Sequence, residues 1–124
     1  MNETETVLAF VEAINNHDVD RIVSLCTEDH RFIDAHGGSV HAGNLASAWR
    51  GYFHFMPHYG IEVETVLRER NVVAVFGSAW GSMNALNPDD RSWGRPCAWQ
   101  AHVHDNRIRR WQVYVDTKPV FDLL

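Results

Sequence analysis

Apolar residues follow two different periods along this chain, and the change from one to the other restricts the fold more than any other feature. Within residues 3–16, Val7, Phe10 and Ile14 recur at helical spacing, which predicts an amphipathic helix. Within residues 61–70, apolar side chains alternate with charged ones, which is typical of a half-buried strand. Helices first and strands afterwards predict an α+β domain with its helices on one face of an antiparallel sheet.

The first half of the chain predicts two more helices and a short strand. Asp18 is a good N-cap for a second helix, whose apolar residues extend to Cys26. A short strand over residues 31–34 follows, and then a turn at Gly37-Gly38. A third helix is predicted over residues 43–56, because Pro57 cannot continue it.

The second half predicts an antiparallel meander. Its strands are expected over residues 61–70, 72–81, 95–104 and 108–116. In the first strand, alternation assigns Ile61, Val63, Thr65 and Leu67 to one face. Asp105-Asn106-Arg107 is a hairpin signal between the last two strands.

Size and charge narrow the classes of function. A chain of 124 residues fits a single domain, 1–124. The net charge of −5 and the lack of a basic run argue against nucleic acid or an anionic membrane as partner. There is no membrane-length apolar run and no secretory signal, so we expect a cytoplasmic protein. We read Cys26 and Cys97 as small buried hydrophobes, and we predict neither metal nor cofactor.

Several strings in this order resemble the nuclear-transport-factor-2-like superfamily, and most closely its SnoaL-like and ketosteroid-isomerase-like branch. The strings are residues 10–20 (FVEAINNHDVD), Phe32-Ile33-Asp34, His41-Ala42-Gly43 and residues 110–116 (RWQVYVD). The resemblance implies a cone-shaped α+β barrel, in which a curved antiparallel sheet wraps three N-terminal helices around a pocket open at one end. It also implies a homodimer through the outer sheet face, where we place Gln100, His102, His104, Gln112, Tyr114 and Asp116.

The same resemblance makes Asp34 the first candidate catalytic residue, because the isomerases hold a proton-shuttling carboxylate at the matching strand position. The residues before it, Phe32 and Ile33, are apolar, and burial on an apolar wall would raise its proton affinity. His36 and His54 are the candidate partners in proton transfer. The alternative is that Asp34 only caps the Gly37-Gly38 turn.

Other positions depart from the catalytic members of the superfamily. Phe10 stands where the isomerases have a tyrosine, and Trp99 or Gln100 falls near their second acid. Val113 stands where the cyclases have a base. Two functions therefore remain: a cofactor-independent lyase or isomerase acting on a small apolar carbonyl compound at Asp34, or a non-catalytic ligand-binding or interaction domain.

An aromatic pocket for a small hydrophobic or aromatic ligand is common to both functions. The expected lining residues are Phe10, Trp49, Phe53, Trp80, Trp99, Trp111, Val113 and Val115. Each could instead fill the core, and a shift of one residue in the last hairpin would move its side chains to the other face.

Overall fold

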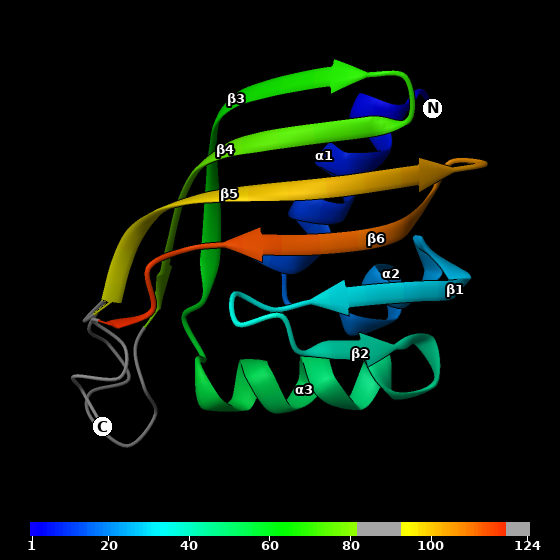
Figure 1. The fold of residues 1–124 in the computed structure, drawn as a ribbon. Coiled ribbons are helices and arrows are strands. Elements are labelled where there is room, and N and C mark those ends of the chain that lie inside the picture. The colour runs from blue at the N-terminus through cyan, green and yellow to red at the C-terminus, as the bar shows by residue number, and fades with distance from the viewer. Residues whose placement is uncertain (82–92, 119–124) are drawn as a thin grey trace.

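Three α-helices, one 3-10 helix and six strands make up the part of the chain that the structure, a computed structural model, describes: residues 1–81 and 93–118 (Figure 1). The helices are α1 (Glu3–Asn15), α2 (Val19–Ser24), η1 (Ala42–Asn44) and α3 (Leu45–Phe55). The strands are β1 (Cys26–Ile33), β2 (Ser39–His41), β3 (Gly60–Glu69), β4 (Val72–Gly81), β5 (Trp93–His104) and β6 (Arg107–Tyr114). None of the helices in these residues is long and apolar enough to cross a membrane.

The six strands form one curved, unclosed sheet in the order β2-β1-β6-β5-β4-β3. Neighbouring strands are antiparallel except β1 and β6, which run parallel. Figure 1 shows α1 crossing behind the sheet and α3 lying along its β2 edge. The α+β prediction is confirmed, with helices segregated to one side of the sheet.

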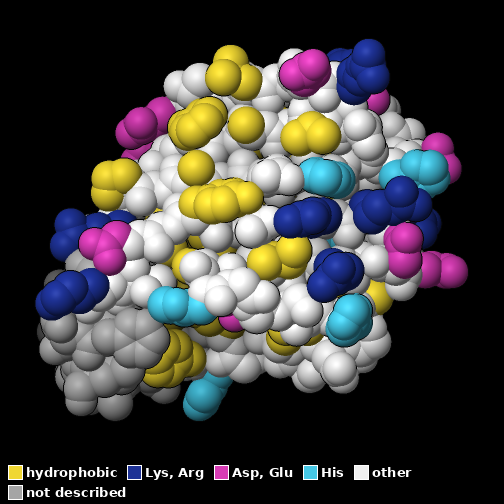
Figure 2. Space-filling model, in the orientation of Figure 1, with side chains coloured by type: hydrophobic (Ala, Val, Ile, Leu, Met, Phe, Trp, Pro, Cys, Tyr) yellow, Lys and Arg dark blue, Asp and Glu magenta, His cyan; other side chains and the backbone are white. Residues whose placement is uncertain are grey.

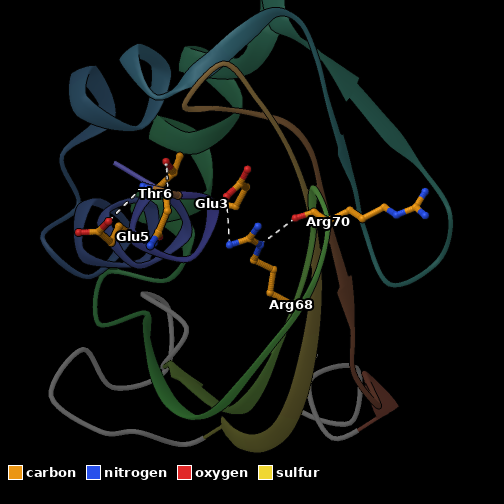
Figure 3. Close-up of polar contacts among 6 residues, drawn as sticks. Glu3, Glu5, Thr6, Arg68 and Arg70 are labelled. Carbon is orange, nitrogen blue, oxygen red and sulfur yellow. Dashed lines mark hydrogen bonds and ion pairs between the residues drawn. The ribbon is translucent and has the colours of Figure 1, made fainter.

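The N-terminus of α1 is capped and tied to the sheet (Figure 3). The Asn2 side chain accepts a hydrogen bond from the Glu5 amide at 2.8 Å, and the Glu5 carboxylate accepts one from the Asn2 amide at 3.0 Å. This reciprocal pair satisfies two amides that the first turn leaves unpaired. Glu3 also forms an ion pair with Arg68 of β3 at 3.4 Å. The cap therefore fixes where α1 begins and which strand it meets.

The predicted apolar stripe of α1 supplies the centre of the core. Val7, Phe10 and Ile14 are fully buried against the inner face of the sheet. At the end of the helix, the Asn15 side chain donates to the Ile61 carbonyl at 2.9 Å and accepts from the Ile61 amide at 2.7 Å. These two bonds position the start of β3 against α1.

The last hairpin has the inward face that alternation predicts. Asp105 and Asn106 both adopt positive φ, at 49° and 62°, as a two-residue turn matching the twist of the strands requires. Trp99 is paired with Val113 in β6, and Ala101 is paired with Trp111. This register excludes the alternative in which these side chains face outward.

Strand β3 departs from simple alternation. The pairing register with β4 shifts between Val63 and Thr65, which is a β-bulge. Beyond it, Val66 packs against the core and Leu67 is 59% exposed. The prediction that Thr65 and Leu67 share a face with Ile61 is wrong, because one extra residue reverses the face of every side chain after it.

The predicted boundary between α2 and the first strand is also wrong. The helix ends at Ser24, and Cys26 opens β1, which is longer than the predicted strand. The Ile108 amide donates to the Leu25 carbonyl at 2.7 Å, and Cys26 is paired with Ile108. A long-range parallel ladder thus draws into the sheet a segment whose local pattern favours a helix.

Candidate functional site

A cavity of about 400 Å³ lies between α3 and the sheet, under the β1–β2 turn. Five elements contribute to it: β1, β2, α3, β5 and β6. The described residues that line it are Phe32, Asp34, Ala35, His36, Val40, Leu45, Ala48, Trp49, Tyr52, Phe55, Met56, Tyr59, Cys97, Trp99, Trp111, Val113, Val115 and Thr117. The exposed members Asp34, His36 and Phe55 mark its mouth.

The walls of the cavity are aromatic and closely packed. Trp99 and Trp111 stack with ring centroids 6.2 Å apart, and Trp49 meets Phe32 edge to face at 5.7 Å. Such contacts hold large rings in fixed orientations. Together with Val113 and Val115, these three tryptophans are the expected pocket residues that line this cavity.

The other three expected pocket residues, Phe10, Phe53 and Trp80, do not line it. Phe10 is fully buried beneath the floor, edge-on to Trp111 at 4.9 Å. Phe53 stacks on His17 at 4.0 Å. Trp80 lies on the outward-facing side of β4. The buried residues of this strand, Val73, Val75 and Ala79, occupy the alternate positions. Helical and strand periods place these rings near the core without deciding which of them reach the cavity.

Asp34 lies at the end of β1, where it both lines the cavity and caps a turn. Its Oδ1 accepts hydrogen bonds from the His36 amide at 2.8 Å and the Gly38 amide at 2.9 Å. A Cβ on residue 38 would lie 2.6 Å from Asp34 Oδ2, so a side chain there would displace the carboxylate. The expectation of a buried carboxylate is wrong, because the side chain is exposed at the mouth. Oδ2 makes no hydrogen bond within residues 1–81 and 93–118.

The two candidate histidines are separated by the fold. His36 lines the cavity beside Asp34, and its Nε2 is hydrogen-bonded to the Thr117 hydroxyl at 3.0 Å. His54 is exposed on α3 and does not line the cavity. The prediction that His54 joins the site is wrong, because its helical position, one residue after Phe53, turns it away from the packed face.

The inner wall carries polar groups that the sequence reasoning missed: Tyr52, Tyr59 and Cys97. Burial, reinforced by the neighbouring Cys97, raises the pKa of both tyrosines above the usual value, and burial raises the pKa of the Cys97 thiol to about 11. These upward shifts reinforce the neutral form that all three groups favour at physiological pH. The sequence spacing could have indicated two of these three residues. Tyr52 follows Trp49 by about one helical turn, and Cys97 shares the strand face of Trp99.

The site contains few charged side chains. Among the described lining residues, Asp34 is the only acidic side chain, and none is Lys or Arg. No group of three or more His, Cys, Asp or Glu that could hold a metal ion occurs within the described ranges. An apolar cleft with a few polar groups is suited to a neutral, largely hydrophobic molecule.

The chain matches one protein-family model and resembles several solved structures. The model of the SnoaL-like domain matches residues 7–111. No curated protein matches the chain. Similar solved structures include an uncharacterized cystatin-fold protein from Novosphingobium aromaticivorans, with 20% identity, a TM-score of 0.80, and coverage of 91% of this chain and 97% of that one.

Two further solved structures share the fold. One is a hypothetical protein with a ketosteroid isomerase-like fold from Catenulispora acidiphila in complex with trimethylamine, with 16% identity, a TM-score of 0.83, and coverage of 95% of this chain and 90% of that one. The other is an LEH-like epoxide hydrolase from M. tuberculosis, with 16% identity, a TM-score of 0.81, and coverage of 97% and 86%. At such identities these likenesses establish the fold alone.

Proposed function

Because the chain belongs to the SnoaL-like domain family, we propose that it binds a small, mostly apolar molecule in the cavity beneath the β1–β2 turn. The observation that carries this proposal is the cavity itself. Its volume of about 400 Å³ lies in the range of small-molecule sites, and its walls are aromatic with few polar groups. A core that existed only for stability would close this space, since each unfilled volume costs packing energy.

Binding can be tested with 2-acetylnaphthalene, a bicyclic ketone, by following the tryptophan indole N–H signals in two-dimensional NMR. Trp49, Trp99 and Trp111 line the cavity, whereas Trp80 lies on the outer face and serves as an internal control. We expect the three cavity signals to shift, with a dissociation constant below about 1 mM. If the cavity signals stay fixed up to the solubility of the probe, or if only Trp80 responds, the binding proposal is wrong.

A second candidate function is proton transfer by Asp34, with His36 beside it. The observation that favours it is that Asp34 lines the cavity while its Oδ2 is left without a hydrogen bond among the described residues. A carboxylate oxygen free to accept a proton at the mouth of an apolar cleft can act as a general base on a bound carbonyl compound. The departures at Phe10 and Val113 instead favour binding without chemistry.

Replacing Asp34 with asparagine is expected to abolish any proton transfer while keeping the turn, because the amide oxygen still accepts from the His36 and Gly38 amides. The measurement is the exchange of the methyl protons of 2-acetylnaphthalene for deuterium in D₂O. A general base accelerates such exchange by about 100-fold over buffer, and the asparagine variant should lose that acceleration. Asp29→Asn, on an exposed position of β1, is the control. Binding without acceleration by the native protein would contradict the catalytic function.

The outer face of the sheet is the proposed contact with a second copy of the chain. Figure 2 shows hydrophobic side chains gathered over β3, β4 and β5, with basic and histidine side chains towards β6. Phe76, Leu67 and Tyr114 are 43%, 59% and 46% exposed, and Phe76 and Tyr114 flank Ala98 across the sheet. Beside them, Gln100 donates to the Tyr114 hydroxyl at 3.1 Å. An apolar centre with a polar border is typical of a protein interface.

Phe76→Glu is expected to convert a dimer into a monomer, because the new charge would be buried at the centre of the contact. Sedimentation equilibrium at micromolar concentration measures the mass directly. Leu8→Glu is the matched control, since Leu8 is 41% exposed on α1, away from the outer face. A native protein that sediments as a monomer, or a Phe76→Glu variant that remains dimeric, would contradict this assembly.

A further inference from the structure

The inner wall of the cavity contains one buried and one half-buried tyrosine whose hydroxyls make no hydrogen bond among the described residues. Tyr59 is 9% exposed and Tyr52 is half-buried, and both line the cavity. Their rings meet edge to face with centroids 4.9 Å apart. Within residues 1–81 and 93–118, neither hydroxyl has a hydrogen-bond partner. Buried tyrosine hydroxyls normally find one, because leaving such a group unpaired is unfavourable.

The hydroxyl of Tyr59 is open to the cavity rather than sealed in the core. In the described residues, the buried side-chain nitrogen and oxygen atoms without a partner are His30 Nε2 and Arg110 Nε. The Tyr59 oxygen is not among them although it lacks a partner, so it retains accessible surface, and the cavity is the space that Tyr59 lines. A polar group nine-tenths buried and open to an apolar cavity is the arrangement that fixes the orientation of a ligand.

We propose that Tyr52 and Tyr59 form a hydrogen-bonding subsite at the inner wall of the cavity, which binds a neutral oxygen of the ligand such as that of a ketone, ester or quinone. This inference rests on the proposed binding function and names its ligand class. It involves neither Asp34 nor any proton transfer.

The chemistry of the subsite determines which oxygen it accepts. A phenol is protonated at neutral pH even at its ordinary pKa, and burial raises the pKa of both tyrosines further, so their hydroxyls donate hydrogen bonds to an acceptor. Cys97, beside them, is a neutral thiol because burial raises its pKa to about 11, and it supplies only a weak donor. No Lys or Arg belongs to the described lining, and Asp34 carries the opposite charge to the one an anion needs. A carboxylate or phosphate would therefore lose its hydration without a compensating cation.

Three probes of similar shape separate these properties. In the first, 2-acetylnaphthalene, the acceptor is a ketone oxygen. The second, 2-isopropenylnaphthalene, has a methylene group in place of that oxygen. The third, 2-naphthoate, carries a charged carboxylate. Each is titrated at neutral pH into the native protein and into Tyr52→Phe and Tyr59→Phe, and the indole signals of the cavity tryptophans report binding.

The deciding quantity is the ratio of the ketone and alkene affinities, compared between the native protein and each variant, because differences in probe hydration then cancel. A neutral hydrogen bond accounts for about a fivefold preference, so each Tyr→Phe change should reduce the ratio by about that factor and leave alkene binding unchanged. Tyr114→Phe, on the outer face of the sheet and outside the cavity lining, is the control and should leave the ratio as it is. Naphthoate should bind about tenfold more weakly than the ketone.

Failure of this subsite is distinguishable from failure of the proposed function. If none of the probes binds, the cavity is not a ligand site and both proposals fall. If ketone and alkene bind but both cavity variants keep the native ratio, the tyrosines do not recognise the oxygen. If naphthoate binds as tightly as the ketone, the restriction to neutral oxygens is wrong. A variant that fails to fold is identified by its NMR spectrum. Either Tyr52→Phe or Tyr59→Phe alone is then enough to test the subsite.

Discussion

Replacing Gly77 with alanine is expected to lower the free energy of unfolding by about 3 kcal/mol. A Cβ at this position would lie 1.9 Å from the Glu62 carbonyl oxygen and 3.0 Å from its carbon. Both are backbone atoms of the neighbouring strand, so no side-chain rotation can relieve the overlap. The strands must separate beside the β3 bulge, and the pairing of Gly77 with Cys97 on the other side is disturbed as well.

Gly51→Ala is the control for this change. Gly51 lies in the middle of α3 with no heavy atom within 4 Å of its ideal Cβ. Alanine there is expected to raise stability by about 0.5–1 kcal/mol, because glycine is the weaker helix former. Urea denaturation followed by tryptophan fluorescence measures both variants. Equal midpoints for Gly77→Ala and the native protein would show that β3 and β4 do not approach as closely as described.

Replacing Val113 with tryptophan is expected to weaken binding of 2-acetylnaphthalene by about 100-fold. Val113 is half-buried, lines the cavity, and is the cross-strand partner of Trp99. An indole at this position extends into space that the native side chain leaves open, where it competes directly with the ligand. Because the space is already empty, stability should change by no more than about 1 kcal/mol.

The matched control for Val113→Trp is Val23→Trp. Val23 is 36% exposed on α2 and does not line the cavity, so the same large ring extends towards solvent there. The affinity of this control variant for 2-acetylnaphthalene should equal that of the native protein. Undiminished binding by a folded Val113→Trp variant would place the ligand elsewhere and remove the cavity from the proposed function.

The helices could be predicted from the sequence because local chemistry decides them. The stripe of Val7, Phe10 and Ile14 requires one buried face, and Asp18 caps α2 by accepting a hydrogen bond from the Arg21 amide at 3.1 Å. The last hairpin could be predicted for the same reason, since Asp105 and Asn106 tolerate the left-handed conformation that the turn requires. Each of these features depends on residues only a few positions apart.

The candidate site could be predicted only in part. Strand alternation brought Trp99, Trp111 and Val113 to the inner face, and all three line the cavity. Alternation could not show that Phe10 lies beneath the cavity floor, because that depends on the packing of α1 against β6. Nor could the apolar residues before Asp34 reveal that its carboxylate turns to solvent and caps a turn.

By itself, the sequence determined the order of the elements and the buried face of most of them, because hydrophobic periodicity and capping act over one or two turns of chain. Tertiary structure alone decided where that periodicity is interrupted and what meets at the cavity. The bulge after Val63 reverses the face of Leu67, and Tyr52, Tyr59 and Cys97 converge from different elements. These outcomes depend on pairing and packing between distant segments, and no local pattern encodes such distances.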